Sequence, residues 1–179
     1  MVTGDEVPGE DAQIIGYDVA KVEAWVNEHV ESLEPPFVWT KLEGGHSNLT
    51  YRIDSANGGR SAVIRRPPMG ELLPKAHDMG REWSCISALW PTPVPVAEPL
   101  AFCETPDVTG AHFYVMGLVE GNAVYNAEDV EAYIAEPDRQ TMAESWIDTL
   151  AALHSLDPDE IGLSDLGRKE DYVLRQIKT

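Results

Sequence analysis

The sequence predicts an α+β fold: a five-stranded antiparallel sheet with one inserted helix, followed by a segment built only of helices. Two observations lead to this prediction. Apolar and polar residues alternate between Phe37 and Arg65, and Asn57-Gly58 separates two of the alternating runs, which is typical of antiparallel hairpins. After Gly121 the apolar residues recur at three- and four-residue spacing, which is typical of helices.

The composition is that of a globular chain with a large excess of acidic residues. The chain has 179 residues, 43% of them hydrophobic, and 13 Lys and Arg residues against 31 Asp and Glu residues give a formal net charge of -18. A field of this sign repels phosphate backbones and anionic lipids, so we expect no nucleic-acid partner and no membrane partner. The two cysteines lack metal-type spacing and no apolar run could span a bilayer, so we expect a cytoplasmic protein.

The first elements follow from capping residues and periodicity. Residues 1–17 combine acidic and small residues without periodicity, and we expect them to form a disordered acidic tail. Asp18 is a suitable N-cap for a helix that carries valines at three- and four-residue spacing and ends before Pro35-Pro36. Strands are then expected at residues 37–42, 49–53 and 62–65.

Proline pairs and apolar spacing define the remaining elements. Pro67-Pro68 ends the third strand, and the inserted helix is expected from about Lys75 to Leu89. We therefore expect a sheet-containing lobe at residues 18–120 and the start of a helical lobe at residues 121–179. The later elements are strands at 96–103 and 112–119, helices at 128–134 and 141–156, and the opening of another helix at 169–179.

Glu82 is an unexpected residue on the inserted helix. On a helical wheel of about 100° per residue it falls inside the apolar arc between Ile86 and Leu89, so its carboxylate should be half-buried. Such a carboxylate needs a cation or a gap in the packing. Arg65 and Arg66, at the end of the third strand, are the nearest candidates in the sequence. The alternative is that Glu82 reaches solvent at the edge of the apolar face.

A glycine turn, a strand cation and a helix carboxylate occur in the order in which protein kinases use them to hold nucleotide phosphates. Gly44 and Gly45 would let backbone amides approach phosphate oxygens, the strand cation would neutralise these oxygens, and Glu82 would fix the cation. Two glycines alone are typical of an ordinary hairpin turn, so the prediction depends on the order of all three parts.

Five segments of the chain carry a family likeness: Leu42–Arg52, Val63–Pro68, Ala76–Glu82, Phe113–Met116 and Leu150–His154. They resemble the aminoglycoside phosphotransferase family, most closely the branch that includes the kinase-like domain fused to some acyl-CoA dehydrogenases. The resemblance runs from about residue 36 to residue 179. It implies a protein-kinase-like N-terminal lobe, the use of ATP and magnesium, and transfer of a phosphoryl group to a small-molecule hydroxyl.

The same resemblance gives roles to individual residues. The glycine turn and the residues after it would cover the phosphates, and Arg65 would replace a third-strand lysine paired with Glu82. The segment after Met116 would be a hinge that meets adenine; without the resemblance, residues 113–119 are simply a buried strand. The expected nucleotide-binding residues are Gly44, Gly45, His46, Ser47, Asn48, Arg65, Glu82, Met116, Gly117, Leu118 and Val119.

The family's catalytic loop, a His-Gly-Asp motif with a later Asn, and its magnesium-binding Asp are missing from this sequence. His154, Asp157 and Asp165 do not replace them, because their spacing differs and Asp157-Pro158 is typical of a turn that ends a helix. We therefore expect no catalytic residue and no metal ligand in this chain, which would be the N-terminal part of a longer kinase-like protein.

Three functional hypotheses follow from these observations. The first is an ATP-dependent phosphotransferase that acts on a small-molecule hydroxyl and is present here mainly as its nucleotide-binding lobe. The second is a non-catalytic module that binds a nucleotide or a partner, and the third is an α+β domain without nucleotide affinity. The sequence leaves the acceptor open between an aminoglycoside and a hydroxyacyl thioester, and it indicates possible self-association through an exposed apolar face.

Overall fold

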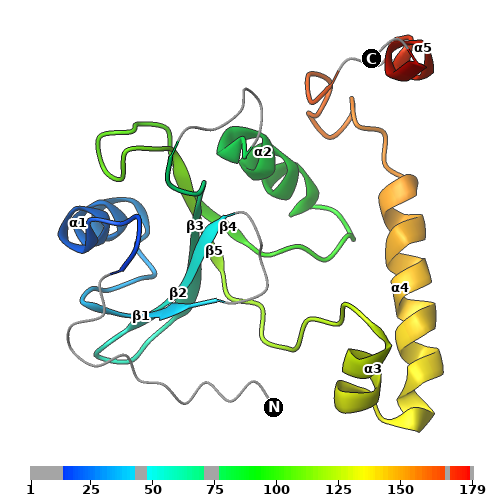
Figure 1. Ribbon diagram of the computed structural model, residues 1–179, viewed down its shortest axis with the longest axis horizontal. Coiled ribbons are helices and arrows are strands. Elements are labelled where there is room, and N and C mark those ends of the chain that lie inside the picture. The colour runs from blue at the N-terminus through cyan, green and yellow to red at the C-terminus, as the bar shows by residue number, and fades with distance from the viewer. Residues whose placement is uncertain (1–13, 43–47, 71–76, 168–169, 178–179) are drawn as a thin grey trace.

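The computed structural model describes residues 14–42, 48–70, 77–167 and 170–177. Its elements confirm the α+β class, because five strands and one inserted helix precede a run of helices (Figure 1). The elements are α1 (Val19–His29), β1 (Phe37–Lys41), β2 (Leu49–Ser55), β3 (Ser61–Arg66), α2 (Met79–Leu89), β4 (Pro99–Cys103), β5 (Phe113–Gly117), α3 (Ala127–Tyr133), the 3-10 helix η1 (Glu136–Asp138), α4 (Arg139–His154) and α5 (Tyr172–Ile177).

The five strands form one antiparallel sheet in the order β1-β2-β3-β5-β4. The first three strands are consecutive neighbours, as the Asn57-Gly58 turn predicts, but β5 rather than β4 pairs with β3. The strand β3 therefore lies at the centre of the sheet, between β2 and β5. Its register places Thr50, Arg65 and Tyr114 side by side across these three strands.

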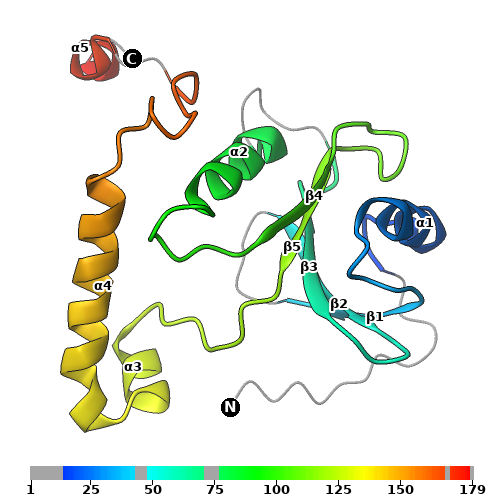
Figure 2. The ribbon, with the colours of Figure 1, turned by 180° about the vertical axis from the view of Figure 1, so that it is seen from behind.

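The helices α1 and α2 cover opposite faces of the sheet (Figures 1 and 2). Side chains alternate along a strand, so Ile64 points into the apolar core shared with α1, whereas Arg65 points to the face that α2 covers. On the α1 face, Trp25 packs edge-on against Phe113, with ring centroids 4.9 Å apart. On the α2 face, the Trp83 ring stacks on Phe102 of β4.

The segment before α1 belongs to the core, which corrects the expected tail at residues 1–17. Tyr17 is buried in the α1-side cluster, and its hydroxyl donates to the backbone oxygen of Leu49 at 3.0 Å. The amide of Ile15 donates to the hydroxyl of Tyr51 at 3.2 Å. The tail prediction is therefore wrong for residues 14–17, and residues 1–13 lie outside the described residues. The predicted N-cap is confirmed, because the Asp18 side chain accepts from the amide of Lys21.

Three element boundaries differ from the sequence prediction. The inserted helix begins at Met79 rather than near Lys75, because Asp78 caps it by accepting from the amide of Arg81 at 3.1 Å. The strand expected at 96–103 begins at Pro99, after the proline-rich connector. The strand expected at 112–119 is limited to 113–117, after which the chain leaves the sheet.

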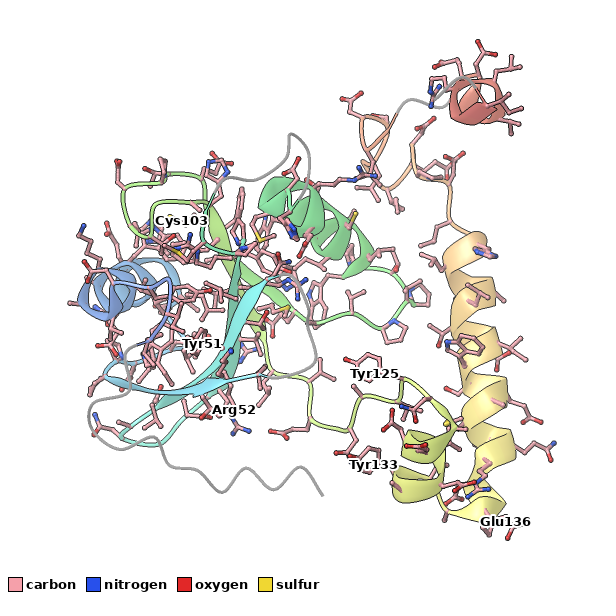
Figure 3. All side chains as sticks on the ribbon, in the orientation of Figure 1. Tyr51, Arg52, Cys103, Tyr125, Tyr133 and Glu136 are labelled. Atoms are coloured by element: carbon pink, nitrogen blue, oxygen red, sulfur yellow. The ribbon has the colours of Figure 1, made fainter. Side chains whose placement is uncertain are left out.

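The helical region after the sheet has its own local organisation. The side chain of Asn126 and the side chain of Asp129 cap the start of α3 reciprocally. The helix α4 lies apart from the sheet (Figure 1), and of the labelled residues Tyr125 precedes α3 and Tyr133 is its last residue (Figure 3). In the part of the chain that the structure describes, no helix has the length and apolarity needed to cross a bilayer.

Candidate functional site

Glu82 is the centre of a hydrogen-bonded cluster between α2 and the sheet. Its Oε2 accepts from Arg65 Nε at 2.9 Å and from the Tyr114 hydroxyl at 3.0 Å, and its Oε1 accepts from Asn48 Nδ2 at 3.1 Å. Both carboxylate oxygens therefore have donors, as a partly buried carboxylate requires. The side chains of Arg65 and Glu82 are 30% and 33% exposed. The predicted half-burial and arginine pairing of Glu82 are confirmed, and the solvent-reaching alternative is wrong.

The structure distinguishes Arg65 from Arg66, which the sequence left open as partners of Glu82. Arg66 points to the opposite face of the sheet, where it is only 3% exposed. Its guanidinium donates to the backbone oxygens of Gly16 and Thr109 and lies over the ring of Tyr17. Burial lowers the pKa of Arg66 from its usual value. Arg66 therefore joins three backbone segments, and Arg65 is the cation of the α2-side cluster.

Arg65 has donors that no group in the described part of the chain accepts. Its Nε is bound to Glu82, whereas within the described residues its Nη1 and Nη2 make no hydrogen bond. A guanidinium is always charged near neutral pH and presents several N–H groups in one plane, which suits phosphate and carboxylate oxygens. The cluster can therefore hold an anion at Arg65 while Glu82 keeps the guanidinium in place.

Tyr114 is a member of the cluster that the sequence analysis did not identify. Its side chain is almost completely buried, and burial, followed by the nearby Glu82 carboxylate, raises the pKa of its hydroxyl above the ordinary value. The phenol therefore stays protonated and donates to Glu82. Tyr114 lies in the motif Phe113–Met116, but only the pairing of β5 with β3 shows that it is beside Arg65.

Asn48 and His77 complete the cluster on the side of β2. The Nδ1 atom of His77 lies 2.8 Å from Oδ1 of Asn48, whose Nδ2 donates to Glu82. His77 was not among the predicted site residues, although it lies in the Ala76–Glu82 motif. Of the predicted phosphate-covering residues, Asn48 is described, and the others lie outside the described residues; these are Gly44, Gly45, His46 and Ser47.

The predicted hinge lies at the end of β5. Gly117 pairs with Ala62 at the start of β3, and its amide donates to the backbone oxygen of Glu98 at 2.8 Å. A Cβ atom at Gly117 would lie 3.1 Å from Nη2 of Arg60 and 3.3 Å from Cβ of Glu98, so glycine is the residue that fits. Leu118 and the exposed Val119 follow outside the strand. Met116 pairs with Val63 across the sheet.

A second hydrogen-bonded cluster in the described residues, formed by Arg52, Asp54 and Ser61, joins β2 and β3 at the far end from Glu82. Among the described residues, no group of three or more His, Cys, Asp or Glu side chains could hold a metal ion. Asp157 accepts from the amide of Asp159 at 2.9 Å in the turn after α4, as the Asp157-Pro158 pattern predicts. His154 is the last residue of α4 and is exposed.

Comparisons with known proteins agree with this geometry. Residues 38–179 match the family described as the phosphotransferase enzyme family. The chain is similar to acyl-CoA dehydrogenase family member 11 of Rattus norvegicus, with 32% identity over 167 residues that cover 91% of this chain and 21% of the relative. The protein of the same name from Gallus gallus is 40% identical over 139 residues, which cover 78% of this chain and 17% of the relative.

A solved structure has a similar fold. The crystal structure of a "putative aminoglycoside phosphotransferase" from Ralstonia eutropha JMP134 superposes with a TM-score of 0.72 at 29% sequence identity, and covers 90% of this chain and 45% of that chain. The chain spans about a fifth of the length of the curated relatives from rat and chicken.

Proposed function

The chain belongs to the phosphotransferase enzyme family, and on this premise we propose that it is the nucleotide-binding part of an ATP-dependent kinase for a small-molecule hydroxyl. The observation that carries the proposal is the Arg65–Glu82 ion pair, in which Nε of Arg65 donates to Glu82 at 2.9 Å. A phosphate group needs a cation that is held in position but still has free donors, and Arg65 meets both conditions.

The phosphates of the nucleotide are assigned to Arg65. Its Nη1 and Nη2 groups would donate to phosphate oxygens, because within the described residues they have no other acceptor. Glu82 would then balance the charge of Arg65 and prevent its side chain from turning away. Phosphoryl transfer depends mainly on positioning and on charge neutralisation, and this chain would contribute part of each.

The adenine ring is assigned to the hinge end of β5. Gly117 pairs with Ala62 and Tyr114 pairs with Arg65, so at about 3.3 Å per residue the hinge and the cation are about 10 Å apart along the strands. Between them, Met116 pairs with the buried Val63, and its partly exposed side chain would offer an apolar contact to a base. A nucleotide extended along β3 would thus have its base near Leu118 and its phosphates near Arg65.

No residue of this chain is assigned to magnesium or to the acceptor hydroxyl. The family's chemistry needs an aspartate that orients the acceptor and side chains that hold magnesium, and these motifs are missing from the sequence. The proposal therefore predicts nucleotide binding by this chain and negligible phosphoryl transfer by it alone.

Isothermal titration of the chain with MgATP tests the proposal. The unchanged chain should bind, and Arg65→Ala should weaken binding about 10- to 100-fold, because a hydrogen bond to a charged group contributes about 1.5–3 kcal/mol. Arg65→Lys should lose less, because it keeps the charge. Lys21→Ala on α1, which removes a charge on the opposite side of the sheet, is the control. No binding by the unchanged chain, or equal binding by Arg65→Ala, would contradict the proposal.

A further inference from the structure

We propose that Asn48 and His77 are positioning residues that hold Glu82, and through it Arg65, in the orientation required by the nucleotide site. The inference rests on the proposed function for the identity of the ligand. The structural basis is a continuous chain of hydrogen bonds that runs from His77 through Asn48 and Glu82 to Arg65. It joins four places in the fold: His77 just before the cap of α2, Asn48 just before β2, Glu82 in the first turn of α2, and Arg65 near the end of β3.

The chemistry of Glu82 fixes the direction of each bond in this chain. An ionised carboxylate only accepts hydrogen bonds, so the atom of Asn48 that faces Glu82 at 3.1 Å must be its amide nitrogen. The amide oxygen of Asn48 then faces His77 Nδ1 at 2.8 Å and requires a donor there. Neutral His77 must therefore carry its proton on Nδ1, and Nε2 is left unprotonated.

The two ends of the Asn48 amide are both used within the protein. The resemblance assigned Asn48 to the phosphate-covering residues, but its Nδ2 donates to Glu82 and its Oδ1 accepts from His77. Each polar atom of Asn48 thus has one partner within the protein, and the bond from Nδ2 holds the Glu82 carboxylate in place. We therefore assign Asn48 the role of fixing Glu82 Oε1, while Arg65 and Tyr114 occupy Oε2.

The backbone of His77 explains why this position can carry the link. Its φ angle is 55°, in the left-handed region that histidine, asparagine and aspartate tolerate better than most residues. Directly after it, Asp78 caps α2. The helix α2 is thus held to the sheet at two levels, through His77 before its first turn and through Glu82 within it. A shift of α2 along the sheet would break both contacts, and Arg65 would lose its support.

Two substitutions at His77 separate the side chain from the backbone. His77→Gly removes the imidazole but favours a positive φ, so it should weaken MgATP binding about three- to tenfold without loss of folding. His77→Asn tolerates the same backbone conformation and keeps an amide donor close to the position of Nδ1, so it should restore most of the affinity. If His77 only served to hold the backbone conformation, both variants would bind MgATP like the unchanged chain, because both fit that conformation. Loss in His77→Gly and recovery in His77→Asn therefore report on the side-chain hydrogen bond.

His29→Ala is the matched control. The Nδ1 atom of His29 also makes one hydrogen bond of 2.8 Å, to the backbone oxygen of Trp25, but it lies on α1 and has no connection with Glu82. This variant should bind MgATP as the unchanged chain does. An equal loss of affinity in His29→Ala and His77→Gly would overturn the inference, because the effect would then not depend on the chain of hydrogen bonds.

A double-mutant cycle tests whether His77 acts through Glu82. In a Glu82→Gln background, His77→Gly should cause little further loss of MgATP affinity, because the link that it supports is already weakened. Fully additive losses would overturn the inference. Nitrogen-15 NMR of the histidine side chains provides a readout without nucleotide: His77 should be the Nδ1–H tautomer. A neutral His77 protonated on Nε2 would also overturn the inference.

These outcomes distinguish the inference from the proposed function. If the unchanged chain does not bind MgATP, the proposed function fails, and with it the nucleotide part of this inference. If the unchanged chain binds and Arg65→Ala weakens binding, but His77→Gly binds normally, the proposed function stands and the positioning role alone fails. Reduced binding in His77→Gly, rescue by His77→Asn and a non-additive cycle together support the role of Asn48 and His77.

Discussion

The sheet region, residues 14–117, and the helical region, residues 127–177, differ in where their large apolar side chains lie. In the sheet region, Phe113 and Ile64 have no exposed surface, and they lie in a cluster shared by α1 and the strands. In the helical region, the residues of α3 and α4 are all described and none is buried. Trp146 on α4 is 74% exposed.

This difference shows that two kinds of stabilisation operate in one chain. The sheet region carries its own core, which supplies the large hydrophobic term that stabilises a fold. With no buried side chain, α3 relies on its capping box and α4 on i-to-i+4 contacts and helix propensity, and such terms are small for isolated helices. The apolar residues of α4 are those that an amphipathic helix would place against a partner. The Arg65–Glu82 cluster of the candidate nucleotide site lies in the sheet region, and the predicted hinge residues Leu118 and Val119 directly follow it.

The largest effect is expected from replacing a large apolar side chain with alanine in each region. Phe113→Ala should lower the free energy of unfolding by about 3–5 kcal/mol, because it leaves a cavity in the sheet core. Trp146→Ala removes a larger side chain but should change the free energy by about 0.5 kcal/mol or less, because that side chain is exposed. Urea denaturation followed by circular dichroism measures both. Similar losses in the two variants would mean that α4 is packed in solution and would break the comparison.

Replacing one arginine in each region with methionine should have a smaller effect on the free energy of unfolding. Arg66→Met should destabilise the fold by about 2–3 kcal/mol, because the backbone oxygens of Gly16 and Thr109 lose their charged donor. Arg139→Met is the control in the helical region, where Nε of Arg139 donates to the backbone oxygen of Ile134 at 3.4 Å on a partly exposed surface. It should change the stability by about 0.5 kcal/mol or less. The comparison would be weakened if Arg66→Met unfolded at the same urea concentration as the unchanged chain.

The smallest expected effect is on the pH dependence of stability. The pKa of Tyr114 is raised by burial and by Glu82, so the folded state holds the phenol proton more tightly than the unfolded state does. The corresponding stability is complete below the unfolded value of about 10 and is lost as the pH rises through the folded pKa. Tyr114→Phe should therefore show a shallower loss of stability above about pH 10.

Two features make this pH test specific. At pH 7, Tyr114→Phe should cost about 1.5–3 kcal/mol, the contribution of one hydrogen bond to a charged group. Tyr125→Phe, in the exposed helical region, should reproduce the alkaline decline of the unchanged chain. The pKa of Tyr17 is also raised by burial, so some decline should persist in Tyr114→Phe. Identical alkaline curves for Tyr114→Phe and the unchanged chain would contradict the assignment.

Local patterns in the sequence predicted the parts of the fold that depend on local physics. Asp18 is an N-cap because of its own side chain, and the Asn57-Gly58 turn joins neighbouring strands. The wheel position of Glu82 predicted that its carboxylate needs a cation or a gap in the packing, with Arg65 and Arg66 as the nearest candidates and a solvent-reaching side chain as the alternative. Arg65 and Arg66 point to opposite faces of β3. Which of them meets Glu82 depends on which face α2 covers, and only the packed structure shows this.

The missed residues depend on contacts between distant segments. Tyr114 lies beside Arg65 because β5, and not β4, is the neighbour of β3 in the sheet. The periodicity of the sequence does not indicate this strand order. His77 contacts Asn48 because α2 begins later than the apolar pattern suggests. Tyr17 was assigned to the tail since residues 1–17 lack periodicity, although its ring packs against the sheet. An aspartate directly before Met79 was the available sign of the later helix start.

The lack of a side chain at Gly117 should restrict which residues homologous sequences carry at neighbouring positions. The Gly117 α-carbon faces the Arg60–Glu98 ion pair, so a methyl group there would require one of these side chains to retreat. Positions 60, 98 and 117 should therefore vary together: homologues that carry a side chain at 117 should have shortened or exchanged a residue at 60 or 98. The end of β5 thus links the identities of three residues that come from three different segments of the chain.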